Sequence, residues 1–317
     1  MTDKTKEHAE MTETPTQQIG NPSAAGDSMI NAEQPDRQGL TKLFYNFGLL
    51  RESPAAIIGL SIIVFWVLIA IFADLVTVYP PNVPDYEAFM KEPFMGAHWL
   101  GTDILGRDIW SRVAFGARTT LIVAPVAMLC AYTLGIIMGM LAGYYGGWVD
   151  NVISRVSDII LSFPLIILFI VIISVFGASA FNIIVAVTLA ASPGIGRIVR
   201  GLTLDLRSLE YVSAAQIRGE NGFYIMMVEL LPNARGPLIV DACLRMGYTI
   251  ITIGILGFLG LGLPPPDPDW GGMVANNIAM VNGGKPFMAI IPAVAISSLV
   301  IGFNLLADGL REISVRD

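Results

Sequence analysis

Charged residues are scarce in this sequence. Asp, Glu, Lys and Arg make up 14% of its 317 residues, and hydrophobic residues make up 54%. A soluble domain usually has about 25% charged residues. This number of charged residues is too small to cover the water-exposed surface of a soluble protein of this length. The composition therefore indicates an integral membrane protein.

Residues that catalyse reactions or bind metals are also few. The two cysteines, Cys130 and Cys243, lie in or beside apolar runs without metal-binding spacing, and the two histidines, His8 and His98, are far apart. The sequence has no GxxxxGK[ST] loop that could hold ATP phosphates, because residues 283–285 (GGK) lack the upstream glycine and the following Ser or Thr. Neither HExxH nor GxSxG is present. We therefore expect no catalytic residue, no metal or cofactor bound by this chain, and no enzymatic activity.

The start of the chain lacks both a secretory signal and apolar periodicity. Residues 1–40 are polar and rich in Thr, Glu, Gln, Pro and Ala, and the first apolar run begins after Pro54. A segment of this composition cannot bury enough apolar surface to fold. We expect residues 1–50 to form a disordered tail.

Six later stretches are long and apolar enough to cross about 30 Å of hydrocarbon. They predict an all-α protein with about six transmembrane helices: Ala56–Val78, Thr120–Gly143, Ile159–Phe176, Phe181–Val199, Met246–Leu263 and Phe287–Leu306.

The distribution of Lys and Arg predicts the orientation of these spans. If the N-terminus is cytoplasmic, most basic residues near the span ends fall on the cytoplasmic side, among them Arg155, Arg197 and Arg311. We therefore expect both termini in the cytoplasm.

A short helix is expected on the outer side, before the second span. Thr102 is a suitable N-cap for a helix that begins at Asp103. On such a helix Asp103–Arg107 and Asp108–Arg112 would form ion pairs four residues apart. The pair Asp241–Arg245 has the same spacing at the expected start of the fifth span, where we interpret it as structural.

Glycine and proline mark several spans. Gly135, Gly139 and Gly143 form a GxxxGxxxG ridge, which predicts close helix packing in lipid. Prolines lie in or near the second, third, fourth and sixth spans, and each favours a kink: Pro125, Pro164, Pro193 and Pro292. Such kinks are consistent with a transport path and equally with packing alone.

The expected spans hold few polar residues and no ionisable one in their interiors. The polar residues are Ser174, Thr188, Ser297 and Asn304. A carrier driven by protons or sodium usually has ionisable groups near the membrane midplane. Their absence argues against transport powered by this chain alone.

The segment between the fourth and fifth spans, about residues 200–245, predicts a protruding pair of short helices. One helix is expected to end after Ala214 and Ala215, and Gly219 suits a tight turn with positive φ. A second is expected from Phe223 to Leu231, stopped by Pro232. Such a pair would either dock into a groove of a soluble partner or lie on the membrane as a plain helical hairpin.

This segment resembles the cytoplasmic EAA loop of permease subunits in binding-protein-dependent ABC importers. That loop reads Glu-Ala-Ala, three residues, Gly, nine residues, and a hydrophobic-x-Leu-Pro ending. Ser213 stands at the Glu position and Glu229 where the peptide-importer branch often has His. The resemblance implies that these residues contact an ATPase: Ser213, Ala214, Ala215, Gly219, Glu229, Leu231, Pro232 and Asn233.

Other segments resemble the dipeptide, oligopeptide and nickel permeases. Residues 98–108 (HWLGTDILGRD) are similar to the LGTDxxGRD signature before the second span of that branch. Residues 142–147 (AGYYGG), 256–262 (LGFLGLG) and 308–311 (DGLR) match later segments of that branch in the same order. The resemblance covers roughly residues 45–312 and is greatest to the second permease of the pair.

The resemblance implies a type I importer (MetI-like) fold with four segments. These would be a cytoplasmic tail (1–50), the first transmembrane helix with a periplasmic loop (51–118), the permease core (119–310) and a cytoplasmic C-terminal tail (311–317). It implies location in the bacterial inner membrane, surrounded by lipid. The partners would be a second permease in a heterodimer, two ATP-binding subunits that hold ATP and Mg²⁺, and an extracytoplasmic binding protein, with no nucleic acid.

Two other functions are kept as alternatives. A stand-alone carrier or channel would work without partners and would line its path with ionisable residues. A membrane scaffold would bind partners without moving a solute. The substrate is open among dipeptides, oligopeptides, nickel, glutathione, opines and sugars.

Overall fold

The structure is a computed structural model and describes residues 53–316. Chain contacts divide the protein after Phe47, and every described residue belongs to the second unit, Gly48–Asp317. The predicted disordered tail, residues 1–50, lies outside the described residues.

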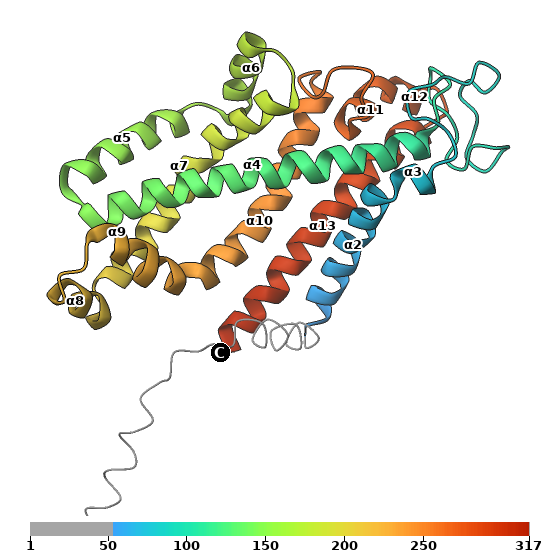
Figure 1. The fold of residues 1–317 in the computed structure, drawn as a ribbon. Helices are drawn as coiled ribbons and strands as arrows, with labels where there is room; N and C mark the ends of the chain where they lie inside the picture. Colours follow the sequence, from blue (N-terminus) through green and yellow to red (C-terminus); the bar gives the residue numbers. More distant parts are fainter. Residues whose placement is uncertain (1–52, 317) are drawn as a thin grey trace, which may run out of the picture. The chain divides into compact units, whose positions relative to one another are not determined.

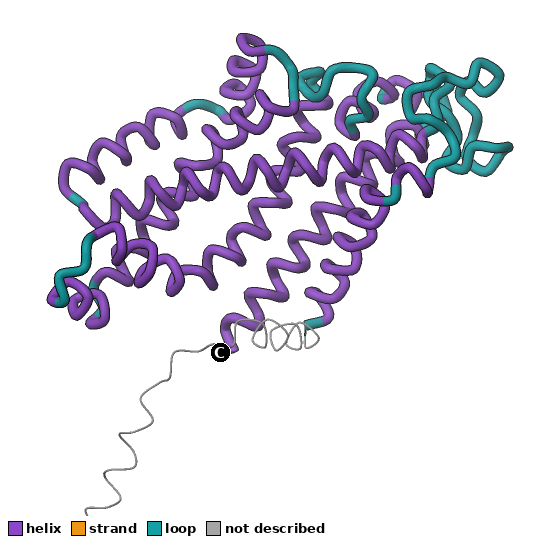
Figure 2. Tube along the Cα trace, in the orientation of Figure 1, coloured by secondary structure: helices purple, strands orange, loops and turns teal. Residues whose placement is uncertain are grey.

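The described part is helical throughout (Figures 1 and 2). Its elements are α2 (Pro54–Ile71), α3 (Ala73–Val76), α4 (Ile109–Tyr145), α5 (Gly147–Ser162), α6 (Leu165–Phe176), α7 (Ala180–Arg207), α8 (Glu210–Ile217), α9 (Gly222–Tyr224), the π-helix η1 (Ile225–Leu230), α10 (Leu231–Phe258), α11 (Trp270–Asn277), α12 (Ala279–Asn282) and α13 (Phe287–Arg316).

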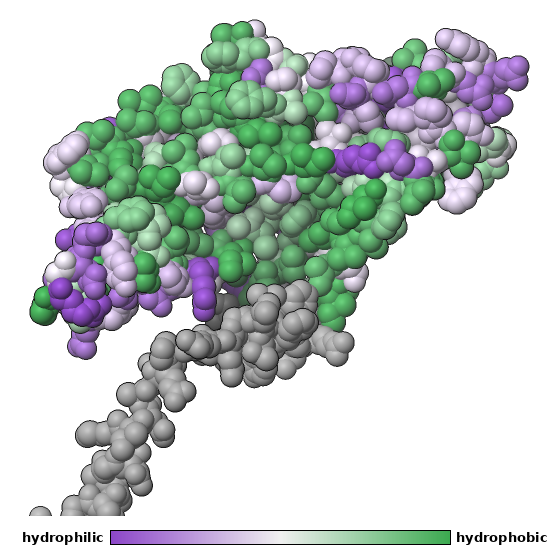
Figure 3. Space-filling view, in the orientation of Figure 1, coloured by the Kyte–Doolittle hydropathy of each residue, from purple (hydrophilic) through white to green (hydrophobic). Residues whose placement is uncertain are grey.

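Five helices in the described residues are long and apolar enough to cross a membrane, or six if a bent pair forms one span. This agrees with the prediction of about six transmembrane helices. Apolar side chains cover the middle of the visible face, while polar residues gather near its two ends, over α8 and over the loop before α4 (Figure 3).

The third expected span, Ile159–Phe176, is not one continuous helix. α5 and α6 meet at Phe163 and Pro164 with a bend of 88°. Pro164 has no N–H to continue the α5 hydrogen bonds, and its ring pushes Phe163 into an extended conformation, with φ −83° and ψ 137°. Pro125, Pro193 and Pro292 instead lie inside the continuous helices α4, α7 and α13.

The glycine ridge of α4 packs against α7, as predicted. A Cβ atom built on Gly139 would lie 2.5 Å from the carbonyl oxygen of Gly196, and one on Gly143 would lie 2.7 Å from Cβ of Thr203. Neither site has room for a side chain. The two helix backbones therefore approach closely along this ridge, which fixes the register of α4 against α7.

Helices α2 and α13 form a second close pair. A Cβ on Gly59 would lie 2.5 Å from the carbonyl oxygen of Gly302, and Gly309 faces Ala56 in the same way. These contacts place the start of α2 beside the C-terminal half of α13. The start of α2 and the C-terminal end of α13 lie at the end of the described bundle where α4 passes into α5 and where α8 is located (Figure 1).

Ion pairs connect α5 to α7. Nε and Nη2 of Arg200 each donate to a carboxylate oxygen of Asp150 at 2.6 Å, and Arg197 donates to Asp158 at 2.5 Å. Ser157 is the one buried residue among the described residues of α5, and the two ion pairs add contacts to α7 on its more exposed side.

The loop before α4 differs from the expected helix at Asp103. Asp103 accepts hydrogen bonds from the backbone N–H groups of Leu105 and Arg107 and pairs with the Arg107 side chain, which closes a turn at Gly106 with φ 74°. The helix begins only at Ile109, and its N-cap is Asp108, not Thr102.

The predicted Asp108–Arg112 ion pair is also wrong. Asp108 accepts from Ser111 and contacts Nδ1 of His98 at 2.9 Å, while Arg112 donates to the carbonyl oxygen of Pro81. The other ring nitrogen of His98 contacts Asp85 at 3.2 Å. Buried His98 thus joins two carboxylates from distant parts of this loop.

The pKa of Asp85 is lowered, first by a hydrogen bond from the backbone N–H of Glu87 and then by the contact with His98.

Candidate coupling segment and central cavity

The predicted contact residues all lie between the end of α7 and the first turn of α10. Ser213, Ala214 and Ala215 are in α8, and Gly219 follows it. The others lie in η1 or at the start of α10: Glu229, Leu231, Pro232 and Asn233. We call residues 208–233 the coupling segment.

Gly219 occupies the tight turn that the sequence predicts. Its φ is 79°, in the left-handed region that glycine adopts most easily. The N–H of Gly219 donates to the carbonyl of Gln216 at 3.0 Å, and that of Glu220 donates to the carbonyl of Ala215 at 3.2 Å. This is the Schellman arrangement, which ends α8 and reverses the chain.

The second helix of the segment does not end at Pro232, contrary to the prediction. The chain passes from α9 through η1 directly into α10, and Pro232 lies in the first turn of α10. A proline at that position loses little, because N–H groups of a first turn have no partner within their own helix. The wider π-helical turn before it accommodates the change in hydrogen bonding.

One face of the coupling segment is anchored to the bundle. Val212, Ala215, Ile225 and Leu230 are fully buried in a cluster that also contains residues of α4 and α7. Through these buried side chains the coupling segment packs against both α4 and α7.

A close backbone approach adds to this anchor. A Cβ on Gly222 would lie 2.8 Å from Cε1 of Tyr144 and 2.9 Å from the hydroxyl of Tyr145, at the end of α4. The sequence analysis did not single out Gly222, since a lone glycine in a loop gives no sign of what it contacts.

The opposite face presents apolar side chains to the surroundings. Ile217 is 87% exposed and Phe223 is 66% exposed, and Ser213 and Ala214 beside them are exposed as well. Ile217 and Phe223 therefore leave apolar surface uncovered on the coupling segment. In the sequence, these exposed residues could have been found as two apolar side chains, Ile217 and Phe223, on either side of Gly219 in a polar stretch.

Glu229 contacts two other residues of the coupling segment. Its carboxylate lies 3.2 Å from Nη2 of Arg218, and its backbone carbonyl accepts from the side chain of Asn233 at 2.6 Å. These contacts connect the turn after α8 to the start of α10, so that Gly219 is held between two fixed ends.

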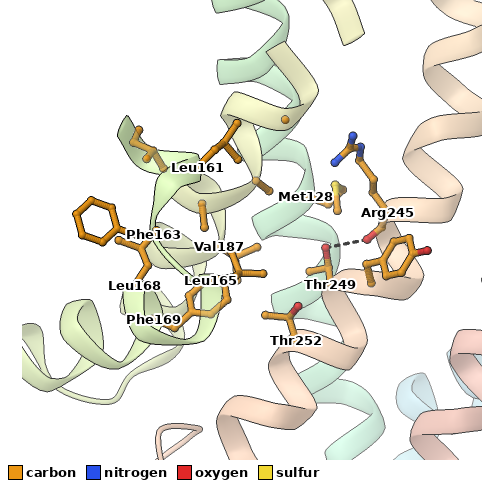
Figure 4. A pocket seen from close by; sticks show the side chains of 15 residues that line it. Met128, Leu161, Phe163, Leu165, Leu168, Phe169, Val187, Arg245, Thr249 and Thr252 are labelled. Carbon is orange, nitrogen blue, oxygen red and sulfur yellow. Dashed lines mark hydrogen bonds between the residues drawn. The ribbon is translucent and has the colours of Figure 1, made fainter. Parts of the chain in front are cut away.

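A cavity of about 450 Å³ lies between α4, the end of α5, α6, α7 and α10 (Figure 4). Its walls are mostly apolar, and it contains one charged side chain, Arg245, which extends from α10 near Thr249 and Met128.

The pair Asp241–Arg245 was expected at the start of the fifth span. Because α10 begins at Leu231 rather than near Met246, the pair Asp241–Arg245 lies in the middle of the helix. The pair itself forms as predicted, with Nε of Arg245 2.7 Å from Oδ2 of Asp241. The hydroxyl of Tyr132 donates to the same oxygen at 2.5 Å.

Family comparison assigns this architecture. Residues 135–317, which include the whole coupling segment, match the family described as binding-protein-dependent transport system inner membrane component. The chain belongs to this family. Residues 49–93 match a second description, the N-terminal transmembrane domain of oligopeptide transport permease C. The chain is therefore a permease subunit of a binding-protein-dependent ABC importer, which favours this prediction over a stand-alone carrier.

Curated relatives cover most of the chain. It is 39% identical to the dipeptide transport system permease DppC of Alkalihalophilus pseudofirmus, over 84% of this chain and 87% of that protein. It is 39% identical to the glutathione transport system permease GsiD of Pectobacterium atrosepticum, over 83% and 87%. A probable D,D-dipeptide permease, DdpC of Escherichia coli, is 36% identical over 90% and 94%.

A solved structure has the same fold. An inward-facing structure of the MetNI methionine ABC transporter matches with a TM-score of 0.54 at 20% identity, over 65% of this chain and 96% of that chain. The predicted type I importer (MetI-like) fold is confirmed.

Proposed function

We propose that this permease forms half of the path through which an ATP-driven importer moves a peptide or a related small solute. The substrate class is supported by the relatives, which are named for dipeptides, glutathione and D,D-dipeptides. A second, similar permease supplies the other half of the path.

The coupling segment is the contact with the ATPase. The observation that carries this proposal is the division of the segment into two faces. Val212, Ala215 and Leu230 anchor one face in the bundle, while Ile217 and Phe223 expose apolar groups on the other. A partner bound to the exposed face can transmit its movement to α7 and α10, since the segment joins these helices directly.

The remaining partners follow from this arrangement. Two ATP-binding subunits hold ATP and Mg²⁺, because this chain has no P-loop of its own. An extracytoplasmic protein delivers the solute to the end of the bundle opposite the coupling segment. The complex lies in the inner membrane, with both ends of this chain in the cytoplasm.

Replacing Ile217 and Phe223 by serine tests the contact. Both side chains are exposed, so the variant folds normally but loses apolar area at the contact. We expect the purified complex to lose ATPase subunits in mild detergent and to import at least about tenfold less solute. Leu75→Ser, at an 81% exposed site beside the outer end of α2, is the matched control.

Two results would contradict the proposal. One is retention of the ATPase subunits and full uptake by the double variant. The other is an equal loss of both in the Leu75→Ser control.

A further inference from the structure

Arg245 lines the cavity between the helices, whose walls are mostly apolar. It is fourteen residues after Leu231 and thirteen before Phe258, at the midpoint of α10. The residues opposite it are also near helix midpoints, Met128 in α4 and Gly194 in α7. Arg245 is the one charged residue among those that line the cavity, and a charge among apolar membrane helices is costly and usually marks a functional site.

The side chain is held by one edge only. Nε of Arg245 donates to Asp241, and Asp241 is fixed in turn by the hydroxyl of Tyr132. The terminal nitrogens Nη1 and Nη2 have no hydrogen-bond partner among the residues that the structure describes. A guanidinium oriented in this way keeps two parallel donors for a planar anion such as a carboxylate.

The cavity has room for such a group. Small residues of α7 line the same cavity: Ala190, Ala191 and Gly194. A Cβ built on Gly194 would lie 3.6 Å from Nη1 of Arg245 with no other atom within 4 Å, so the space beside the donors is open. A volume of about 450 Å³ is within the range of small-molecule sites.

We infer that Arg245 is a binding residue for a carboxylate of the transported solute, within the path through the membrane. This inference rests on the proposed function and adds a chemical requirement to it. Dipeptides, D,D-dipeptides and glutathione share at least one free carboxylate, and the cavity offers a matching pair of donors. Asp241 and Tyr132 are positioning residues, because they hold the guanidinium without facing the solute.

Equilibrium dialysis of the complete importer in lipid nanodiscs, without its binding protein, tests this inference. The probes are radiolabelled L-alanyl-L-alanine and its C-terminal amide, which differ in the carboxylate alone. We expect the unaltered complex to retain the free acid about tenfold more tightly than the amide. Arg245→Gln abolishes this difference and Arg245→Lys keeps part of it, because lysine retains the charge without the fork.

Matched variants separate binding from structure. Arg155→Gln removes an exposed arginine that lies outside the cavity and forms no ion pair among the described residues, and it leaves the difference unchanged. Gly194→Ala adds a methyl group at ordinary contact distance and is tolerated, while Gly194→Leu fills the space and lowers retention of the free acid.

Equal retention of acid and amide by the unaltered complex would overturn the inference. So would an equal loss of both probes in Arg245→Gln, since that result assigns Arg245 to structure alone. The proposed function is tested separately, by the Ile217 and Phe223 double variant and its Leu75→Ser control, whichever result the dialysis gives.

Discussion

Substitution of Gly219 by valine tests the turn of the coupling segment. A Cβ at this site meets no atom within 4 Å, so the effect comes from backbone strain and not from a clash. A residue with a side chain costs about 1–2 kcal/mol at a φ of 79°, and a β-branched one is at the upper end. About 2 kcal/mol shifts the equilibrium away from the native turn by roughly 30-fold.

The loss of this turn changes how α8 is presented to the ATPase. We expect Gly219→Val to preserve ATP hydrolysis and to lower the solute imported per ATP at least about tenfold. Gly219→Ala has a smaller effect, and Gly219→Asn has the smallest, because asparagine tolerates the left-handed conformation. The assay measures uptake and phosphate release in proteoliposomes that contain the complete importer.

Gly284 is the matched control for this series. It has the same φ of 79° and the same open surroundings, but it lies between α12 and α13, at the opposite end of the bundle from α8 (Figure 1). Gly284→Val introduces equal strain and leaves the uptake per ATP unchanged. Normal coupling in Gly219→Val, or equal uncoupling in Gly284→Val, would refute the assignment of this turn to coupling.

Two further predictions concern the bundle and the loop before α4. Gly139→Leu forces α4 away from α7, because even a Cβ atom built on Gly139 would lie 2.5 Å from a backbone oxygen. Overpacking of this kind costs about 1–3 kcal/mol or more. We expect a lower yield of monodisperse complex in detergent, whereas leucine at the open site Gly201 leaves the yield unchanged. His98→Ala removes the buried link between Asp85 and Asp108 and destabilises the loop by about 1–3 kcal/mol. We expect limited proteolysis to cut residues 77–108 faster in this variant. An unchanged cleavage rate would show that His98 does not stabilise the loop.

Much of the helical architecture could be predicted from hydropathy, because a membrane helix needs a long apolar run whatever its neighbours are. The turn at Gly219 could be predicted too, since few residues other than glycine adopt its φ. The packing of the α4 ridge followed from the spacing of small residues, because only small side chains permit close backbones.

The features that could not be predicted depend on contacts between distant residues. Pro164 breaks its span while Pro193 does not, although both remove a helix hydrogen bond. The start of α4 at Asp108 depends on the turn that Asp103 makes before it.

The position of Arg245 in the middle of a continuous helix was missed for a different reason. The hydropathy pattern starts the fifth span after the last charged residue, Arg245. The helix α10 begins earlier and continues through Asp241 and Arg245, which form an ion pair. Hydropathy alone therefore cannot locate a paired charge inside a membrane helix.

Photocrosslinking from Ala214 tests the central claim, that the coupling segment contacts the ATPase, most directly. A benzophenone maleimide is attached to Ala214→Cys in a chain whose native cysteines, exposed Cys130 and half-buried Cys243, are replaced by alanine. Ala214 is exposed on α8, and the control is Met95→Cys, at a 65% exposed site in the loop before α4. We predict an adduct with the ATP-hydrolysing subunit from position 214 and none from position 95. No ATPase adduct from position 214, or equal adducts from both positions, would contradict the account.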